Sequence, residues 1–258
     1  MAVHKILLFV SALAILDAAS ARAADDPFVG TWKLNVSKSG FSGYEREIKD
    51  LGGNKYEWFW ASLFMDAKEH PFTFGGTYIA TQDSPDKWTV TRKHDGKMTS
   101  VGTWTLSDGG QQLKTEVQGT RADGTPYTQH TVYTREGGGS GIAGKWKVQH
   151  FQASSNSDWV IKPYGKDGLS FAWPTDKDHE DIKFDGKDYP HEGPRQMAGE
   201  TSCAKRIDNY TIQLTDKVNG KVRSTQEVQV SQDGRTLTDT IHRSGDEKPL
   251  VLVYEKQM

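Results

Sequence analysis

Cysteine is almost missing from this sequence, because Cys203 is the only one among 258 residues. A single cysteine excludes an internal disulfide and a zinc site built from several cysteines, and we expect Cys203 to be a structural side chain rather than a reactive one. A strong net charge is also lacking, since the formal charge at pH 7 is -2. The composition therefore offers no electrostatic basis for binding nucleic acid or an anionic membrane.

Long hydrophobic runs are absent beyond the first 23 residues. Within that stretch, an apolar run at 6–15 follows a short basic segment, and the small-x-small triplet Ala-Arg-Ala occupies 21–23. The run is too short to span a bilayer, and the combination is typical of a secretory signal peptide. We expect residues 1–23 to be a signal peptide cleaved near Ala24, a periplasmic or secreted protein, and no transmembrane segment.

No segment after the signal has a convincing helical period. Side chains alternate instead: the aromatic residues of 56–60 share faces of a short run, and Trp88, Val90 and Arg92 share one face of another. Asp-Gly and Asn-Gly pairs recur between such runs, and they are strong signals for hairpin turns. The pattern predicts antiparallel meanders of about eight short strands each, closed into barrels because closure removes exposed edges.

The chain contains an ordered internal repeat. Each copy begins with Gly-x-Trp-Lys and ends with a strand that contains Val-Tyr. The matched segments are 28–39 with 142–155, 47–60 with 160–173, 95–100 with 219–224, 106–117 with 230–241, and 132–136 with 253–257. Self-similarity that preserves the order of several segments indicates a tandem duplication.

A short Gly-rich stretch separates the two copies and is typical of a linker. We therefore expect one barrel over residues 24–136, a linker at 137–141 and a second barrel over residues 142–258. Each copy has the size of an ordinary small domain.

The strand openings resemble those of the calycins, the superfamily of lipocalins and fatty-acid-binding proteins. The resemblance rests on FVGTWKL at 28–34, and the end of the chain, VLVYEKQ at 251–257, is similar to the last strand of the fatty-acid-binding branch. The second half, with FDGKDYP at 184–190, also resembles small exported bacterial lipocalin-like proteins. The resemblance implies an all-β fold with two tandem antiparallel lipocalin-like meander β-barrels.

In calycins the Gly-x-Trp motif starts the first strand and its Trp plugs the closed end of the barrel. The resemblance implies this structural role for Gly30, Trp32, Gly144 and Trp146. A large buried aromatic ring contributes much of the buried area in a small core, so we expect these residues to hold the fold rather than to contact a ligand.

The chain departs from the fatty-acid-binding branch at the ligand carboxylate. In that branch an Arg two residues before the Tyr of the last strand helps to hold the carboxylate. Here Thr131 precedes Tyr133, and Leu252 precedes Tyr254. Because Thr and Leu cannot form the bidentate contact of an Arg, a fatty acid held by that clamp is not the expected ligand.

Aromatic side chains provide the candidate ligand site. Aromatic-lined barrel interiors suit apolar or ring-shaped molecules, so the expected partner is a small hydrophobic or amphipathic molecule. Alternatively, one face of the same strand packs in the core and the other lies between the two barrels. The candidate ligand-binding residues are Tyr56, Trp58 and Trp60, with Phe171 and Trp173 at the matching place in the second copy.

The stretch 176–193 is unusually rich in Asp, Glu and His. These residue types can bind a divalent metal, but their spacing matches no metal-binding motif. We therefore predict a solvated hairpin rim, no metal site and no other cofactor.

Three classes of function remain open. The preferred hypothesis is an exported binding protein without catalytic residues, since the chain lacks a nucleophile elbow, a phosphate loop and a dinucleotide fingerprint. The second is a calycin-type isomerase, hydratase or hydrolase that pairs a carboxylate with His70, His179 or His191. The third is a structural or interaction module with filled barrels and apolar surface patches.

Overall fold

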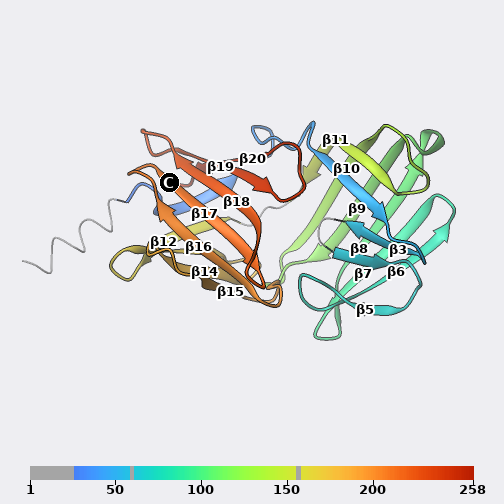
Figure 1. Ribbon diagram of the computed structural model, residues 1–258, viewed down its shortest axis with the longest axis horizontal. Coiled ribbons are helices and arrows are strands. Elements are labelled where there is room, and N and C mark those ends of the chain that lie inside the picture. Colours follow the sequence, from blue (N-terminus) through green and yellow to red (C-terminus); the bar gives the residue numbers. More distant parts are fainter. Residues whose placement is uncertain (1–25, 59–60, 155–157) are drawn as a thin grey trace, which may run out of the picture.

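The computed structural model describes residues 26–58, 61–154 and 158–258 (Figure 1). The predicted signal peptide at 1–23 and its cleavage site near Ala24 lie outside these residues. The described chain is almost entirely β-strand, with one 3-10 turn at Asp108–Gly110 and no α-helix. The all-β prediction is confirmed, and two ten-stranded antiparallel sheets replace the expected sheets of about eight strands.

The first sheet, here named barrel I, contains strands β2 to β11 and curls into a nearly closed barrel (Figure 1). Its two edge strands follow each other directly in the chain. In spatial order the strands are β4 (Ala61–Phe64), β3 (Lys55–Trp58), β2 (Glu45–Asp50), β11 (Gly144–Ala153), β10 (Pro126–Glu136), β9 (Gln112–Thr120), β8 (Lys97–Ser107), β7 (Lys87–His94), β6 (Thr77–Ser84) and β5 (Glu69–Pro71).

A tyrosine side chain bridges the seam between the two edges of barrel I. Tyr78 on β6 is fully buried, and its hydroxyl accepts a hydrogen bond from the Phe64 amide at 2.8 Å. The same hydroxyl donates to the Ser62 carbonyl at 3.2 Å. These bonds replace part of the missing strand pairing, because unpaired backbone groups at a buried edge cost free energy.

The second sheet, here named barrel II, closes completely (Figure 1). Closure occurs because the first strand of the chain pairs with the last. In spatial order the strands are β1 (Gly30–Leu34), β12 (Trp159–Tyr164), β13 (Gly168–Trp173), β14 (Asp178–Lys183), β15 (Tyr189–Glu192), β16 (Glu200–Arg206), β17 (Thr211–Val218), β18 (Lys221–Val230), β19 (Thr236–Arg243) and β20 (Leu250–Lys256).

The two copies of the repeat exchange their first strands. Strand β1 belongs to the first copy but pairs with β12 and β20 of the second. Strand β11 belongs to the second copy but pairs with β10 and β2 of the first. The expected boundaries, 24–136 and 142–258 around the linker at 137–141, thus describe the sequence repeat, and each sheet draws one strand across them. Both exchanged strands carry the Gly-x-Trp-Lys motif, so each presents the same residue types to the barrel that it joins.

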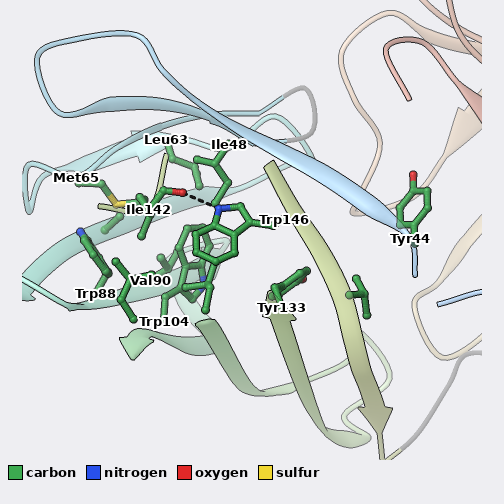
Figure 2. Close-up of a cluster of buried hydrophobic side chains, with 14 of the residues drawn as sticks. Tyr44, Ile48, Leu63, Met65, Trp88, Val90, Trp104, Tyr133, Ile142 and Trp146 are labelled. Carbon is green, nitrogen blue, oxygen red and sulfur yellow. Dashed lines mark hydrogen bonds between the residues drawn. The ribbon is translucent and has the colours of Figure 1, made fainter. Parts of the chain in front are cut away.

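Each exchanged strand carries a buried Trp of the Gly-x-Trp-Lys motif. Trp32 and Trp146 are 0% and 1% exposed. The indole of Trp32 donates to the Phe28 carbonyl at 2.8 Å. The indole of Trp146 donates to the Ile142 carbonyl at 2.8 Å, as Figure 2 shows. Both rings are therefore satisfied by the residue four positions earlier, so the two copies build the same local structure.

A cation from the other copy covers each of these Trp rings. The Lys256 ammonium lies 5.1 Å from the ring centre of Trp32, and the Arg135 guanidinium lies 4.2 Å from that of Trp146. The glycine of the motif makes room for this contact. A Cβ on Gly30 would lie 2.5 Å from Lys256 Cε, and a Cβ on Gly144 would lie 2.5 Å from Arg135 Nη1.

The two barrels also pack against each other through side chains. The hydrophobic cluster of barrel I, part of which Figure 2 shows, includes Ile241 and Leu250 from the β19–β20 hairpin of barrel II. Elsewhere, Arg121 of barrel I pairs with Asp176, which precedes β14, at 3.0 Å. Both partners are largely buried, so this ion pair is well shielded from solvent.

Candidate functional site

A cavity of about 240 Å³ lies between the inner faces of barrel I. Its walls come from both sides of the barrel, because strands β3 and β4 face strands β7 to β10 across it. The lining is mainly aromatic and aliphatic with a small polar group at one side, and consists of Trp58, Ala61, Leu63, Phe72, Phe74, Val90, Arg92, Ser100, Gly102, Trp104, Val117, Tyr127 and Gln129.

Strand register creates a row of small side chains in the middle of the cavity. Val90, Gly102, Val117 and Gln129 are direct neighbours across β7, β8, β9 and β10. Gly102 is central to this row, and a Cβ there would lie 3.4 Å from the Val117 side chain. A larger residue at this position would therefore reduce the cavity.

Aromatic rings form the floor of the cavity. Trp104 lies one row deeper than Gly102 on β8, and its ring centroid is 4.4 Å from that of Trp58 on β3. The ring of Tyr133 meets Trp58 edge-on at 6.0 Å. Rings from three strands thus present a rigid apolar surface, which favours a flat or apolar molecular group.

A polar row forms the opposite side of the cavity. Arg92, Ser100, Gly119 and Tyr127 are direct register neighbours across β7 to β10. Gly119 is needed there because a Cβ would lie 2.8 Å from Tyr127 Cε1 and 2.7 Å from Ser100 Cβ. The missing side chain lets the tyrosine ring lie across β9.

Arg92 supplies the positive charge of this row. Its guanidinium lies 4.1 Å from the ring centre of Phe72, and no carboxylate among the described residues pairs with it. Burial lowers the pKa of Arg92, with Tyr127 acting in the opposite direction and the charge of Arg195 adding to the decrease. An unpaired, half-buried guanidinium offers a strong position for a ligand anion.

An open groove of about 540 Å³ adjoins the cavity and shares Ser100 and Tyr127 with it. Tyr127 thus lies between the groove and the interior. The guanidinium of Arg121 lies 5.2 Å from the centre of the tyrosine ring, and Arg121 is itself held by Asp176. The contact between the barrels therefore fixes a side chain at the edge of the cavity.

The predicted ligand-binding residues divide between the two barrels. Trp58 lines the cavity of barrel I, and Tyr56 packs against its core. Trp60 lies outside the described residues. Phe171 is buried in barrel II, where Trp173 stacks on Trp159 at 5.8 Å. The structure therefore does not bring the two groups together.

Arg92, Tyr127 and Gly102 were not among the predicted site residues. The signal for Arg92 is present in the alternation with Trp88 and Val90, which places its side chain on the inner face of β7. No comparable signal marks Gly102, because its importance comes from its register neighbours on other strands.

The acidic stretch at 176–193 is partly buried rather than a fully solvated rim. Asp178 and Glu180 face inward and are 2% and 9% exposed. Glu180 contacts His191 Nδ1 at 2.7 Å, and Asp178 pairs with Arg195. Among the described residues no group of three or more His, Cys, Asp or Glu is arranged to hold a metal ion.

His191 is held as a cation. Burial alone would lower its pKa, but hydrogen bonds to Asp178 and Glu180 outweigh burial and raise the pKa to about 10. An imidazolium at neutral pH cannot accept a proton as a general base.

The other two candidate histidines also lie beside carboxylates. His179 lies 3.5 Å from Glu192. His70 lies 2.8 Å from Asp66, and its ring stacks on that of Phe64.

Comparisons with known protein families, with curated proteins and with solved structures find no significant match to this chain. Among the described residues, no helix is long and apolar enough to cross a membrane.

Proposed function

We propose that this protein binds a small amphipathic anion inside barrel I. The observation that carries the proposal is the cavity of about 240 Å³ with an aromatic floor and the unpaired Arg92 on its polar side. The apolar part of the ligand would lie on Trp58 and Trp104, and its negative group would meet Arg92. Because the aromatic floor and the polar row lie on opposite sides of the cavity, the ligand would bind in one preferred orientation.

The volume limits the size of the ligand. Cavities of about 150 Å³ accommodate benzene, so 240 Å³ suits a single substituted ring or a short branched chain. A long-chain fatty acid would need a larger space. The proposed ligand class is therefore a small aromatic or aliphatic carboxylate, or another anion of similar size.

The charge of Arg92 supports the choice of an anion. Leaving a guanidinium half-buried without a partner costs free energy, and a carboxylate would recover it through two parallel hydrogen bonds. Ser100, the register neighbour of Arg92, offers a hydroxyl beside the same group. This arrangement differs from the Arg and Tyr clamp of the fatty-acid-binding branch.

Two further parts of the proposal rest on the sequence. The relation to the calycins depends on the Gly-x-Trp-Lys openings at 30–33 and 144–147. A periplasmic or extracellular site of action depends on the signal-like segment at 1–23. Export would place the binding barrel where small molecules from the surroundings are met.

Native mass spectrometry of the mature protein purified from its own host tests the proposal. We expect a small anionic molecule bound to the wild type and lost from Gly102→Val, because the valine side chain fills the middle row. A Gly138→Ala variant is the matched control, since a Cβ at that linker position meets no atom within 4 Å. A molecule retained by Gly102→Val would contradict the proposal. So would a wild type that stays unliganded after incubation with phenylacetate.

A further inference from the structure

The buried side-chain atoms of barrel II that have no hydrogen-bond partner among the described residues include one on β12 and one on β19. These two atoms are Nε1 of Trp159 on β12 and Oδ1 of Asp239 on β19. Each side chain is 3% exposed. Buried polar groups are normally paired, so a donor and a carboxyl oxygen left open on the inner face of one barrel indicate a missing binding partner.

Tyr254 connects the two unpaired groups. Its ring centroid is 5.5 Å from that of Trp159. Its register partner on β19 is Leu237, two residues before Asp239 and on the same face of the strand. The charge of Asp239 also contributes to raising the pKa of Tyr254, so Tyr254 lies close to both groups.

The charges around Asp239 favour a positive ligand. Asp216 on β17 accepts hydrogen bonds from three neutral groups, Ser202 at 3.1 Å, and Ser224 and Gln226 at 2.6 Å each. None of these three donors carries a positive charge. The pKa of Asp239 is raised to about 8 by burial and by Asp216, with Arg243 acting in the opposite direction.

Aromatic rings surround the same part of the interior. Trp159 lies 5.7 Å from Phe171 and 5.8 Å from Trp173, measured between ring centroids, in addition to its contact with Tyr254. Faces of aromatic rings attract organic cations, and the attraction is stronger where water is excluded.

We propose that the interior of barrel II binds a small organic ammonium ion that also carries a hydroxyl or carbonyl oxygen. The ammonium group pairs with the Asp239 carboxylate, and the oxygen accepts a hydrogen bond from Trp159 Nε1. The aromatic rings enclose the carbon skeleton. This site is separate from the anion site of barrel I and has the opposite charge preference.

Binding is coupled to a proton. At pH 6.5 free Asp239 carries a proton, since its pKa is about 8. Pairing with an ammonium ion requires the carboxylate, so one proton passes from Asp239 to solvent for each ammonium bound. Asp216 and Arg243 are the ionisable groups whose charges act on Asp239, and Asp239 in turn acts on Tyr254, whose pKa is raised mainly by burial.

Calorimetric titration with 2-aminoethanol at pH 6.5, in two buffers of different ionisation enthalpy, tests the proposal. We expect binding with release of about one proton and a loss of affinity of tenfold or more in Asp239→Asn. Trp159→Phe should lower the affinity less, because it removes only one hydrogen bond. Asp233→Asn, at an exposed turn carboxylate, is the control and should bind as the wild type does.

Several results would overturn the proposal. Equal affinity of the wild type and Asp239→Asn would place the ligand elsewhere. Choline, a second organic cation, serves as another probe. If neither 2-aminoethanol nor choline binds, ordered water alone satisfies Trp159 Nε1 and Asp239 Oδ1. Trp159→Phe keeps the test decisive if Asp239→Asn folds poorly. Ethylene glycol, the neutral analogue, should not bind. None of these results depends on the anion site of barrel I.

Discussion

Replacing Asp239 by Asn should remove a large part of the pH dependence of folding. The folded protein holds the pKa of Asp239 at about 8, above its ordinary value of 3.8, mainly because the side chain is buried. Between these pH values the folded state keeps a proton that the unfolded chain has released. The contribution of Asp239 to stability is therefore fully present below about pH 4 and is lost as the pH rises through 8.

The magnitude follows from the shift. One pH unit within this window changes the free energy of unfolding by about 1.4 kcal/mol for one proton. Between pH 5 and pH 7 the wild type should lose roughly 2 to 3 kcal/mol relative to Asp239→Asn. Asn cannot ionise and has a similar shape, so the variant should be the more stable protein at pH 7.

Urea denaturation followed by tryptophan fluorescence, from pH 5 to pH 9, measures the effect. The raised pKa of His191 contributes its own pH dependence, but both proteins share it and the difference between them isolates Asp239. Asp233→Asn is the control, since hydrogen bonds from Ser231 and the Arg235 amide lower the pKa of that exposed carboxylate. Parallel pH profiles for the wild type and Asp239→Asn would refute the reasoning.

Two further variants test how the barrels are held. Tyr78→Phe should destabilise the protein by about 1 to 3 kcal/mol, because the buried backbone groups at the seam lose their bridging hydroxyl; an unchanged urea midpoint would mean that the seam is held by other contacts. Gly144→Ala should be destabilising and should weaken the contact of Arg135 with Trp146, since φ of 140° disfavours a side chain and the new Cβ would lie 2.5 Å from the guanidinium. Gly138→Ala, where φ is not positive, should leave the thermal midpoint unchanged.

Local pattern explains why the sequence predicts the fold class. Asp-Gly and Asn-Gly turns and alternating side chains depend on neighbouring residues alone, so strands and hairpins can be read along the chain. The same alternation places Leu237, Asp239 and Ile241 on one face of β19. A buried Asp between two apolar side chains could therefore have been predicted, although its missing partner could not.

The strand exchange could not be predicted from these patterns. The segments at 29–34 and 143–148 carry the same motif, so either fits either barrel, and local sequence does not choose between them. The choice depends on chain connectivity and on contacts with distant strands, such as those of β1 with β12 and β20.

The cavity of barrel I could be predicted only in part from local patterns. Arg92 alternates with Trp88 and Val90, which predicts its inward direction. The absence of a carboxylate partner for Arg92 among the described residues, and the row that joins Arg92 to Ser100 and Tyr127, depend on register across four strands. Pairing of this kind is long-range, so the site appears only when the sheet is assembled.

Calorimetric titration of the wild type and of Arg92→Met with phenylacetate and its neutral amide, phenylacetamide, tests the central claim most directly. We expect the wild type to bind phenylacetate at least ten times more tightly than phenylacetamide, and Arg92→Met to remove this preference. Lys87→Met, at the exposed start of the same strand, should retain it. Equal affinity of the wild type for the two compounds, or an unchanged preference in Arg92→Met, would contradict the assignment of barrel I as an anion-binding barrel.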